Sequence, residues 1–353
     1  MNKFFRNIFI LITSFILLSA ISIISVLWTY SNDLPDYKFL KSYKPPVSSK
    51  VYSGNGDLVA DFSQEKRVFV PFNSIPKNVI NAFLSAEDKN FFKHPGVDAK
   101  GVIRAVINNI SNILSSKRLE GASTITQQVA KNFLLTNEVS LNRKIKEAIL
   151  AFRIERALSK ERILELYLNQ IYLGSGAYGV AAASLEYFDK SIKDLNYSEA
   201  ALLAALPKAP SRYNPYRDPD IAKFRRNLVL KNLLDNSYLT SEWYEKLTKE
   251  EIILKKNKKI YLEDAQYFIE DVRKSVIETL SYDKVYKQGF NINTPIDLNL
   301  QTIATKSLRD GLIAYDKRKG WRGPLTNKIY NSEWKKDLEK YKLENSINWK
   351  LAI

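Results

Sequence analysis

The first thirty residues contain the feature that most restricts how this chain folds. No charged residue occurs between Ile8 and Tyr30, and isoleucine, leucine, phenylalanine and valine dominate this run. A helix of this length, rising 1.5 Å per residue, crosses a hydrocarbon core of roughly 30 Å. Lys3 and Arg6 precede the run, and such cations tend to stay on the cytoplasmic side. We therefore expect an uncleaved membrane anchor over residues 8–30, with residues 1–7 inside and the rest of the chain outside.

The composition narrows the possible chemistry. The 353 residues include no cysteine and a single histidine, which rules out thiol catalysis and disulfides and disfavours a histidine zinc site or a serine triad. The formal net charge of +16 is typical of proteins with an anionic partner, and nucleic acid, a membrane surface or a phosphorylated substrate would each fit. A well-solvated, lysine-rich surface is an equal alternative. Because the expected anchor puts most of the chain outside the cytoplasm, we expect a membrane and no nucleic acid.

The rest of the chain divides into three segments of different pattern. Residues 31–74 suggest an extended linker with a β-hairpin turning at Asn55-Gly56, and alternation over residues 67–72 predicts a third strand. Apolar residues at helical spacing then continue over residues 75–238, which is the usual size of one domain. Residues 239–353 combine Lys- and Glu-rich helical patterns with one expected strand.

The first group that could carry chemistry ends an apolar helical pattern. Glu87 and Asp88 are adjacent there, and aromatic residues, His94 and a Pro-Gly turn follow. A carboxylate at the end of such a helix is partly desolvated, which raises its pKa and suits it to proton transfer. An acidic pair that merely faces water is the alternative, and His94 alone fits a structural hydrogen bond better than catalysis.

A second polar group lies in residues 121–132. On a helix, Gln127 and Gln128 precede Lys131 by four and three residues, so the three side chains cluster. Ser123 is the expected N-cap, and a helix start of this kind favours an anion. An ordinary capped surface helix fits the same spacing.

A third group combines opposite charges. Arg143 and Glu147 are four residues apart on a helix expected over residues 142–158, whose apolar residues occupy two faces. That pattern predicts that the helix is buried on both sides. Burying a cation and an anion is costly unless they pair with each other or serve a function. A plain ion pair remains an equal alternative.

Three more cations complete the set. Lys160 lies in the first turn of an expected helix, where a cation interacts unfavourably with the helix dipole, so we expect it to bind a ligand. Arg225 and Arg226 follow a turn later in the chain. Each signal is weak alone. In this order and spacing they resemble the five motifs of glycosyltransferase family 51, the peptidoglycan polymerase module of class A penicillin-binding proteins. The resemblance covers residues 69–230, and residues 293–301 resemble the entry into a penicillin-binding region.

The resemblance implies a mainly α fold: a lysozyme-like helical glycosyltransferase domain with an N-terminal transmembrane helix, a small β element before it and a truncated α/β region after it. The expected segments are 1–7 (cytoplasmic tail), 8–30 (anchor), 31–74 (linker), 75–238 (glycosyltransferase domain) and 239–353 (linker and truncated start of the transpeptidase or inserted-domain region). The helix over residues 102–114 resembles the jaw that dips into the membrane, and an ordinary core helix is the alternative.

The resemblance also implies the reaction and its residues. An acceptor sugar hydroxyl attacks the anomeric carbon of a lipid-diphosphate donor, with inversion. Glu87 would be the general base, and Glu147 would organise the diphosphate or a divalent ion such as Mg or Mn, with no organic cofactor. The substrate-binding set would be Ser123, Gln127, Gln128, Lys131, Asn132, Arg143, Lys144, Lys160, Arg225 and Arg226. The partners would be the lipid-linked precursor, the growing glycan, the membrane, and elongation or division proteins.

Two other functions remain open. A lysozyme-like muramidase needs a similar fold and a carboxylate, although cations around Glu147 have no diphosphate to neutralise in hydrolysis. A membrane-tethered scaffold without catalysis would use the basic surface alone. Transpeptidases need Ser-x-x-Lys and a later Lys-Thr/Ser-Gly, and no Lys-Thr/Ser-Gly occurs in this sequence. We therefore expect a piece of a bifunctional enzyme that lacks transpeptidase activity.

Overall fold

The computed structural model describes Asn7, parts of 11–31, and residues 34–320 except for short gaps. Those gaps are Lys44, Gln64, Ala122, Asn137, Val139, and residues 115–120 and 256–262. The chain forms two compact units, Met1–Asp297 and Leu298–Ile353.

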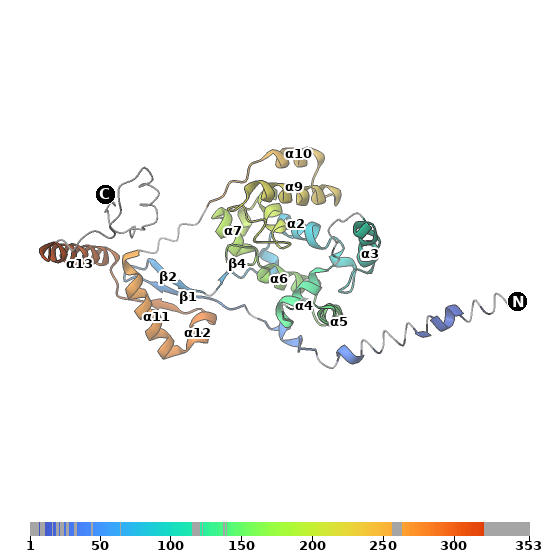
Figure 1. Cartoon of the computed structure of the whole chain (residues 1–353), viewed down its shortest axis with the longest axis horizontal. Helices are drawn as coiled ribbons and strands as arrows, with labels where there is room; N and C mark the ends of the chain where they lie inside the picture. Colours follow the sequence, from blue (N-terminus) through green and yellow to red (C-terminus); the bar gives the residue numbers. More distant parts are fainter. Residues whose placement is uncertain are drawn as a thin grey trace, which may run out of the picture. The chain divides into compact units, whose positions relative to one another are not determined.

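The first unit is mainly helical, as expected (Figure 1). Its α-helices are α2 (Lys77–Glu87), α3 (Ala99–Leu114), α4 (Ile125–Leu134), α5 (Leu141–Ala157), α6 (Lys160–Gln170), α7 (Val180–Phe188), α8 (Tyr197–Ala205), α9 (Pro219–Asp235), α10 (Ser241–Lys249), α11 (Gln266–Leu280) and α12 (Tyr282–Lys287). Its strands are β1 (Ser49–Tyr52), β2 (Leu58–Phe62), β3 (Lys66–Arg67), β4 (Ala177–Tyr178) and β5 (Asn291–Asn293). The second unit contributes α13 (Leu298–Arg318).

The helix starts follow from local capping. The side chain of Ser159 accepts from the Arg162 amide at the start of α6. The expected cap of α4 is wrong by one residue. Thr124, and not Ser123, caps α4, because its side chain accepts from the Gln127 amide while the Gln127 side chain accepts from the Thr124 amide. This reciprocal capping box satisfies two backbone donors and leaves the Ser123 hydroxyl available for other partners.

The core joins two groups of helices that meet at the end of α2. Helix α8 packs against α2 and α9, and α4 packs against α5 and α6. Four buried alanines of α8 allow its neighbours to approach closely: Ala200, Ala201, Ala204 and Ala205. On the side of α2, Phe83 is fully buried and lies edge-on to Tyr167 of α6. The C-terminal end of α2 is therefore fixed between both groups.

The strands form two small sheets. β1 and β2 make the predicted antiparallel hairpin, and β5 joins β1 in parallel, which gives the order β2-β1-β5. The third strand expected over residues 67–72 is shorter and has a different partner. β3 covers only Lys66–Arg67 and pairs in parallel with β4, more than a hundred residues later in the chain. A pairing this distant cannot be inferred from local alternation.

Burial of α5 on both sides is confirmed for one face and is only partial for the other. Leu150 and Ile154 are buried on the first face. On the second face Ile149 is buried, whereas Leu141 is 82% exposed and Phe152 is 44% exposed.

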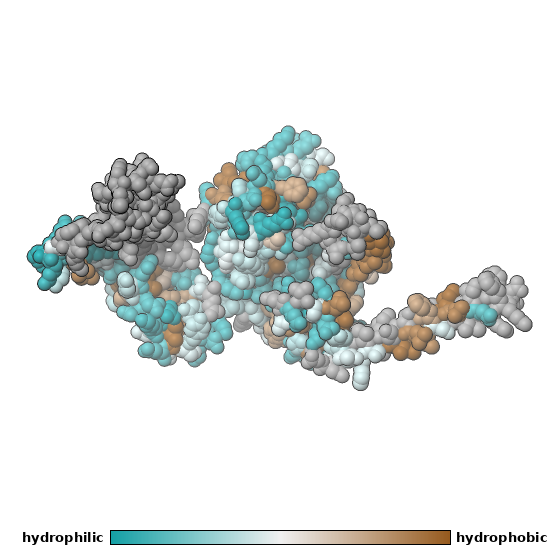
Figure 2. All heavy atoms as spheres, viewed as in Figure 1, coloured by the Kyte–Doolittle hydropathy of each residue, from teal (hydrophilic) through white to brown (hydrophobic). Residues whose placement is uncertain are grey.

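Helix α3 also exposes apolar side chains. Figure 2 shows hydrophobic residues gathered over this helix. The exposed aliphatic residues of α3 are Val102, Ile103, Val106, Ile107 and Ile110.

The expected anchor over residues 8–30 falls only partly within the described residues. Its described parts, such as residues 11–15 and 28–30, are helical. Across the described part of the chain, none of the helices has the length and apolar character that a membrane crossing requires. The tail at residues 1–7 is likewise outside the description, apart from Asn7.

Gly96 fits closely against α5 and allows a direct test of the fold. Its φ is +105°, and a Cβ placed there would lie 2.8 Å from the backbone carbonyl of Ala151. Gly56 also has a positive φ, +87°, but has nothing within 4 Å of a Cβ. We expect Gly96→Ala to lower the free energy of unfolding more than Gly56→Ala, whose cost is the backbone strain of about 1–3 kcal/mol. Thermal unfolding of both variants measures the difference, and equal losses would contradict the packing described here.

Candidate active site

Glu87 is the last residue of α2 and lies half-buried where the two groups of helices meet. Its Oε2 accepts a hydrogen bond of 2.7 Å from Nε2 of Gln128 on α4. Burial raises the pKa of the Glu87 carboxyl above its ordinary value, and the negative charge of Asp88 adds to this increase. The bond from Gln128 and the charges of Lys208 and Arg225 act in the opposite direction. Glu87 is thus a carboxylate with enhanced basicity, oriented by an amide.

Asp88 is buried and points away from solvent. Its carboxylate lies 3.0 Å from Nε2 of His94 and accepts a 3.1 Å bond from the amide of Ile125, the first residue of α4. The amide of Gly96 donates to Nδ1 of His94 at 3.2 Å. An anion at a helix N-terminus is favoured by the helix dipole. The pair therefore has a structural role, as expected for His94.

Glu147 is almost completely buried on α5, at 1% exposure, and both of its oxygens bind cations. Arg143 donates to Oε1, and Lys144 binds Oε2 at 2.6 Å. Lys144 also donates to the Ser123 hydroxyl at 3.0 Å, immediately before α4. The predicted cluster of charges thus forms and lies beside the N-terminus of α4. Lys144 is half-exposed, so its ammonium group remains accessible to an anion from solvent.

The remaining predicted site residues of α4 differ in how deeply they are buried. Gln127 is buried and occupied by the capping box. Lys131 is half-buried and Asn132 is exposed, one helical turn beyond Gln128 and on the same side of α4. Within the described ranges, no hydrogen bond or ion pair to the Lys131 ammonium is found. A role in substrate binding fits Lys131 and Asn132 and stays a prediction for both.

Lys160 is held by protein groups. Its ammonium donates to the backbone oxygen of His94 at 2.7 Å and to Oε1 of Glu155 at 2.7 Å, and it lies over the ring of Phe91. These contacts attach α6 to the loop that follows Glu87. A direct contact of Lys160 with a ligand stays a prediction.

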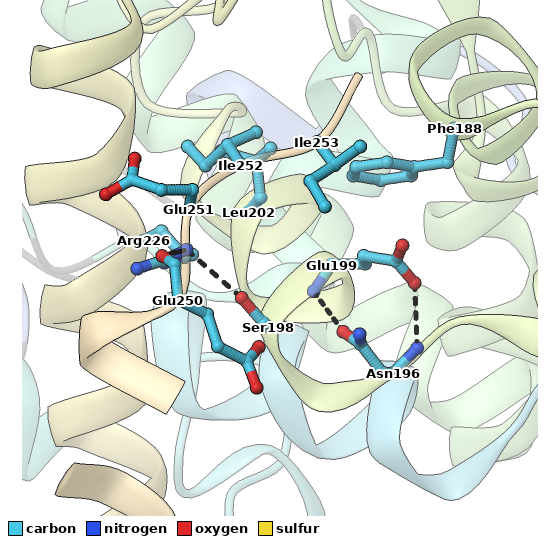
Figure 3. A pocket seen from close by; sticks show the side chains of 10 residues that line it. All are labelled: Phe188, Asn196, Ser198, Glu199, Leu202, Arg226, Glu250, Glu251, Ile252 and Ile253. Carbon is cyan, nitrogen blue, oxygen red and sulfur yellow. Dashed lines mark hydrogen bonds between the residues drawn. The ribbon is translucent and has the colours of Figure 1, made fainter. Parts of the chain in front are cut away.

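Arg225 and Arg226 point in different directions from α9. The guanidinium of Arg225 lies 4.9 Å from the ring centre of Tyr213, and its buried Nε has no hydrogen-bond partner among the described residues. Arg226 is fully buried and donates to the backbone oxygens of Thr248 and Glu250. It lines a separate cavity of about 200 Å³, shown in Figure 3, with α8 and residues 250–253. The charge of Arg225 therefore acts on Glu87, whereas Arg226 lies apart in the separate cavity.

Lys208 is a site residue that the sequence analysis missed. It is exposed in the turn after α8, and its charge acts on Glu87 together with that of Arg225. The turn-forming prolines Pro207 and Pro210 flank it. Those prolines were the only local signal, and they indicate a turn without showing which residue the turn faces.

The side chains around Glu147 do not by themselves form a suitable site for a metal ion. Both carboxylate oxygens already bind Arg143 and Lys144, whose positive charges oppose a divalent cation. In the part of the chain that the structure describes, no group of three or more His, Cys, Asp or Glu side chains comes together to hold a metal.

Comparisons with known proteins place the chain among relatives of one family. A sequence model described as transglycosylase matches residues 55–234. Penicillin-binding protein 1A of Rickettsia felis is 48% identical over 330 residues, covering 93% of this chain and 42% of that protein. Penicillin-binding protein 1A of Aquifex aeolicus is 49% identical over 283 residues, covering 80% of this chain and 38% of that protein. The chain spans about two fifths of the length of these curated relatives.

A solved structure is also similar. The crystal structure of penicillin-binding protein 1A from Haemophilus influenzae aligns with a TM-score of 0.52 and 28% sequence identity. The alignment covers 86% of this chain and 36% of that one.

The raised pKa of Glu87 predicts a gain in stability when its charge is removed. Because its pKa is higher in the folded than in the unfolded state, its stabilising contribution is complete below the unfolded-state pKa and is lost as the pH rises through the folded value. We expect Glu87→Gln to raise the melting temperature at pH 7, and this advantage to shrink in acid. Exposed Glu245→Gln is the control. A melting temperature lowered by Glu87→Gln would contradict the burial described here.

Proposed function

The chain belongs to the transglycosylase family, and on that basis we propose that it polymerises a lipid-linked disaccharide into peptidoglycan strands, with Glu87 as the general base. The observation that carries the proposal is the position of Glu87. Its carboxylate has enhanced basicity, is oriented by Gln128, and lies at the junction of α2, α4 and α9 with cations nearby.

The reaction needs a base at the acceptor and little help from an acid at the donor. The acceptor hydroxyl of a sugar is a weak nucleophile until a base removes its proton, so a carboxylate whose pKa is raised suits this role. A lipid diphosphate leaves as a stabilised anion and needs no strong acid. As the acceptor oxygen bonds to the anomeric carbon, the bond to the diphosphate oxygen breaks, and the proton passes to Glu87.

The cations beside α4 would stabilise the leaving group. Negative charge grows on the diphosphate in the transition state, and positioned cations stabilise it without reorganising. Lys144 is half-exposed next to Ser123, where the N-terminus of α4 also favours an anion. Glu147 would hold Lys144 and Arg143 in place through its two oxygens.

Several surface features support work at a membrane. Exposed aliphatic residues line α3, the helix predicted to be the jaw (Figure 2). The net charge of +16 would attract anionic lipid headgroups and an anionic lipid-linked substrate. We propose that the catalytic unit lies on the outer side of the inner membrane, with residues 8–30 as its anchor.

Hydrolysis of glycan is the second candidate, and the site disfavours it. Glycosidases use two carboxyl groups that both reach the sugar. The nearest acid in sequence, Asp88, is buried and bonded to His94 and to the Ile125 amide. It therefore cannot serve as the second carboxylate without breaking the start of α4.

Incubation of the full chain with lipid-linked disaccharide tests the function. We expect the parent protein to form polymer. Glu87→Gln should lose at least about a hundredfold in rate, because general base catalysis contributes on that order. The exposed control Glu245→Gln should keep full activity. Gel separation of the labelled glycan measures the product. Shortened wall glycan would indicate a hydrolase, and a fully active Glu87→Gln protein would favour the scaffold.

The role of Lys144 gives a second test. Removing a group that stabilises transition-state charge lowers kcat, so we expect Lys144→Ala to reduce kcat/KM about tenfold or more. Lys77→Ala removes the same charge from an exposed position at the start of α2 and is the matched control. Equal effects of the two variants would show that only the overall positive charge matters.

A further inference from the structure

A loop after α6 supports the turn between α8 and α9 (residues 207–217), which contains Lys208. In this loop Gly174, Ser175 and Gly176 have φ values of +86°, +50° and +75°. Such values favour glycine, and at a serine they persist only where surrounding contacts hold the backbone. Contacts from outside the loop must therefore fix its conformation.

Lys66 of β3 supplies such contacts. Its amide donates to the backbone oxygen of Gly176 at 3.2 Å, and its ammonium donates to the backbone oxygen of Ser175 at 3.3 Å. The same ammonium binds Oε2 of Glu186 on α7 at 2.6 Å. Lys66 therefore connects the loop to α7, although it lies more than a hundred residues earlier in the chain.

The turn between α8 and α9 is bound to the same two residues. Nδ2 of Asn214 donates to the Ser175 hydroxyl at 3.0 Å, and the Tyr216 hydroxyl donates to the backbone oxygen of Glu186 at 2.9 Å. Oδ1 of Asn214 also accepts from the Tyr216 amide at 2.9 Å, which fixes the turn itself. The two residues that the Lys66 ammonium binds are thus the two that support this turn.

Close packing joins the loop and the turn as well. A Cβ placed on Gly174 would lie 2.8 Å from the Tyr187 hydroxyl and 3.2 Å from the backbone oxygen of Pro210. The ring of Tyr187 stacks on that of Tyr216, with ring centres 5.5 Å apart. Pro210 follows Lys208 by two residues. A displacement of the loop therefore displaces the part of the turn that carries Lys208.

The turn affects the site through two cations. Lys208 belongs to the turn, and the ring of Tyr213, also in the turn, lies 4.9 Å from the guanidinium of Arg225. The charges of Lys208 and Arg225 both lower the pKa of Glu87. The position of the turn therefore decides how strongly these cations stabilise the ionised base.

We propose that Lys66 is a positioning residue for the reaction, and that it acts through Ser175 and Glu186. By holding the turn between α8 and α9, it fixes the two cations whose charges act on the base. The inference rests on the proposed function and goes beyond it, because Lys66 binds the loop and α7 rather than the base.

The other groups around Glu87 do not depend on the turn. Burial and the charge of Asp88 raise the pKa of Glu87, and the bond from Gln128 on α4 lowers it. From α6, the phenol of Tyr167 interacts electrostatically with Glu87 and Asp88, and burial raises its pKa well above the ordinary value, so it stays protonated. Loss of the Lys66 ammonium should thus weaken the effect of the two cations alone, and the pKa of Glu87 should rise.

Two substitutions of Lys66 in the full chain, with lipid-linked disaccharide as substrate, test this role. Lys66→Met keeps the aliphatic stem and removes the ammonium. We expect it to lower kcat/KM about tenfold, because small displacements of charged groups cost rate. The acid limb of its kcat/KM profile, which reports the free enzyme, should move to higher pH. Lys66→Arg keeps a cation that can donate to both partners, so we expect kcat/KM within about threefold of the parent.

Lys190→Met is the matched control. Lys190 binds Glu199 at 2.7 Å, and the two side chains are 37% and 14% exposed, against 37% and 13% for Lys66 and Glu186. Melting temperatures of both methionine variants measure what each lost ion pair costs in stability. A merely structural role of Lys66 would lower the melting temperature without moving the acid limb. Lys190→Met should leave kcat/KM and the acid limb unchanged.

The outcomes separate this inference from the proposed function. If the parent chain forms no polymer, the proposed function fails. If the parent forms polymer but the acid limb of Lys66→Met coincides with that of Lys190→Met, the positioning role is overturned. Equal losses for Lys66→Met and Lys66→Arg would overturn it as well.

A double-mutant cycle with Lys208→Met tests the route of the effect. If Lys66 acts through the turn, the loss in the double variant should be smaller than the product of the two single losses, because both changes remove the same contribution. Losses that simply multiply would show that Lys66 does not act through the turn, and the inference would be wrong.

Discussion

The site depends on how the end of α2 is attached to the first turn of α4. Glu87 and Asp88 follow each other in the chain, yet one binds a side chain and the other a backbone amide of the same helix. Because the N-terminal amides of a helix need acceptors, the Asp88 carboxylate satisfies α4 and is stabilised by it. Stability of the fold and orientation of the base therefore depend on the same bonds.

Helix α4 also separates the two kinds of charge that the proposed chemistry requires. Gln128 lies on the side of the base, and Ser123, immediately before the helix, contacts Lys144 and through it Glu147. A buried carboxylate is costly unless cations pair with it, and Glu147 has two. Apolar residues would fill the same space more favourably. The cost of burying the Glu147 carboxylate is therefore explained if Glu147 holds Lys144 in place to bind an anionic ligand.

Local signals in the sequence predicted much of the fold, and long-range contacts limited the rest. Caps and periodicity placed the helices closely, and the partial burial of Glu87 followed from its place at the end of an apolar helix. The cap of α4 was missed by one residue because Ser123 and Thr124 are chemically equivalent as caps, and the Gln127 partner selects the second. Lys208 was missed because its approach to Glu87 depends on how α8 packs, which no local pattern contains.

The two arginines of α9 show why residue type alone does not assign a site. Successive residues on a helix point about 100° apart, so Arg225 and Arg226 cannot face the same neighbour. Arg226 donates to the backbone oxygens of Thr248, in the last turn of α10, and of Glu250, directly after that helix. Those bonds fix the rotation of α9 about its axis, and with it the place of Arg225 over the ring of Tyr213, from which its charge acts on Glu87. The buried arginine thus orients its neighbour, although it lines a cavity that neither Arg225 nor Glu87 lines.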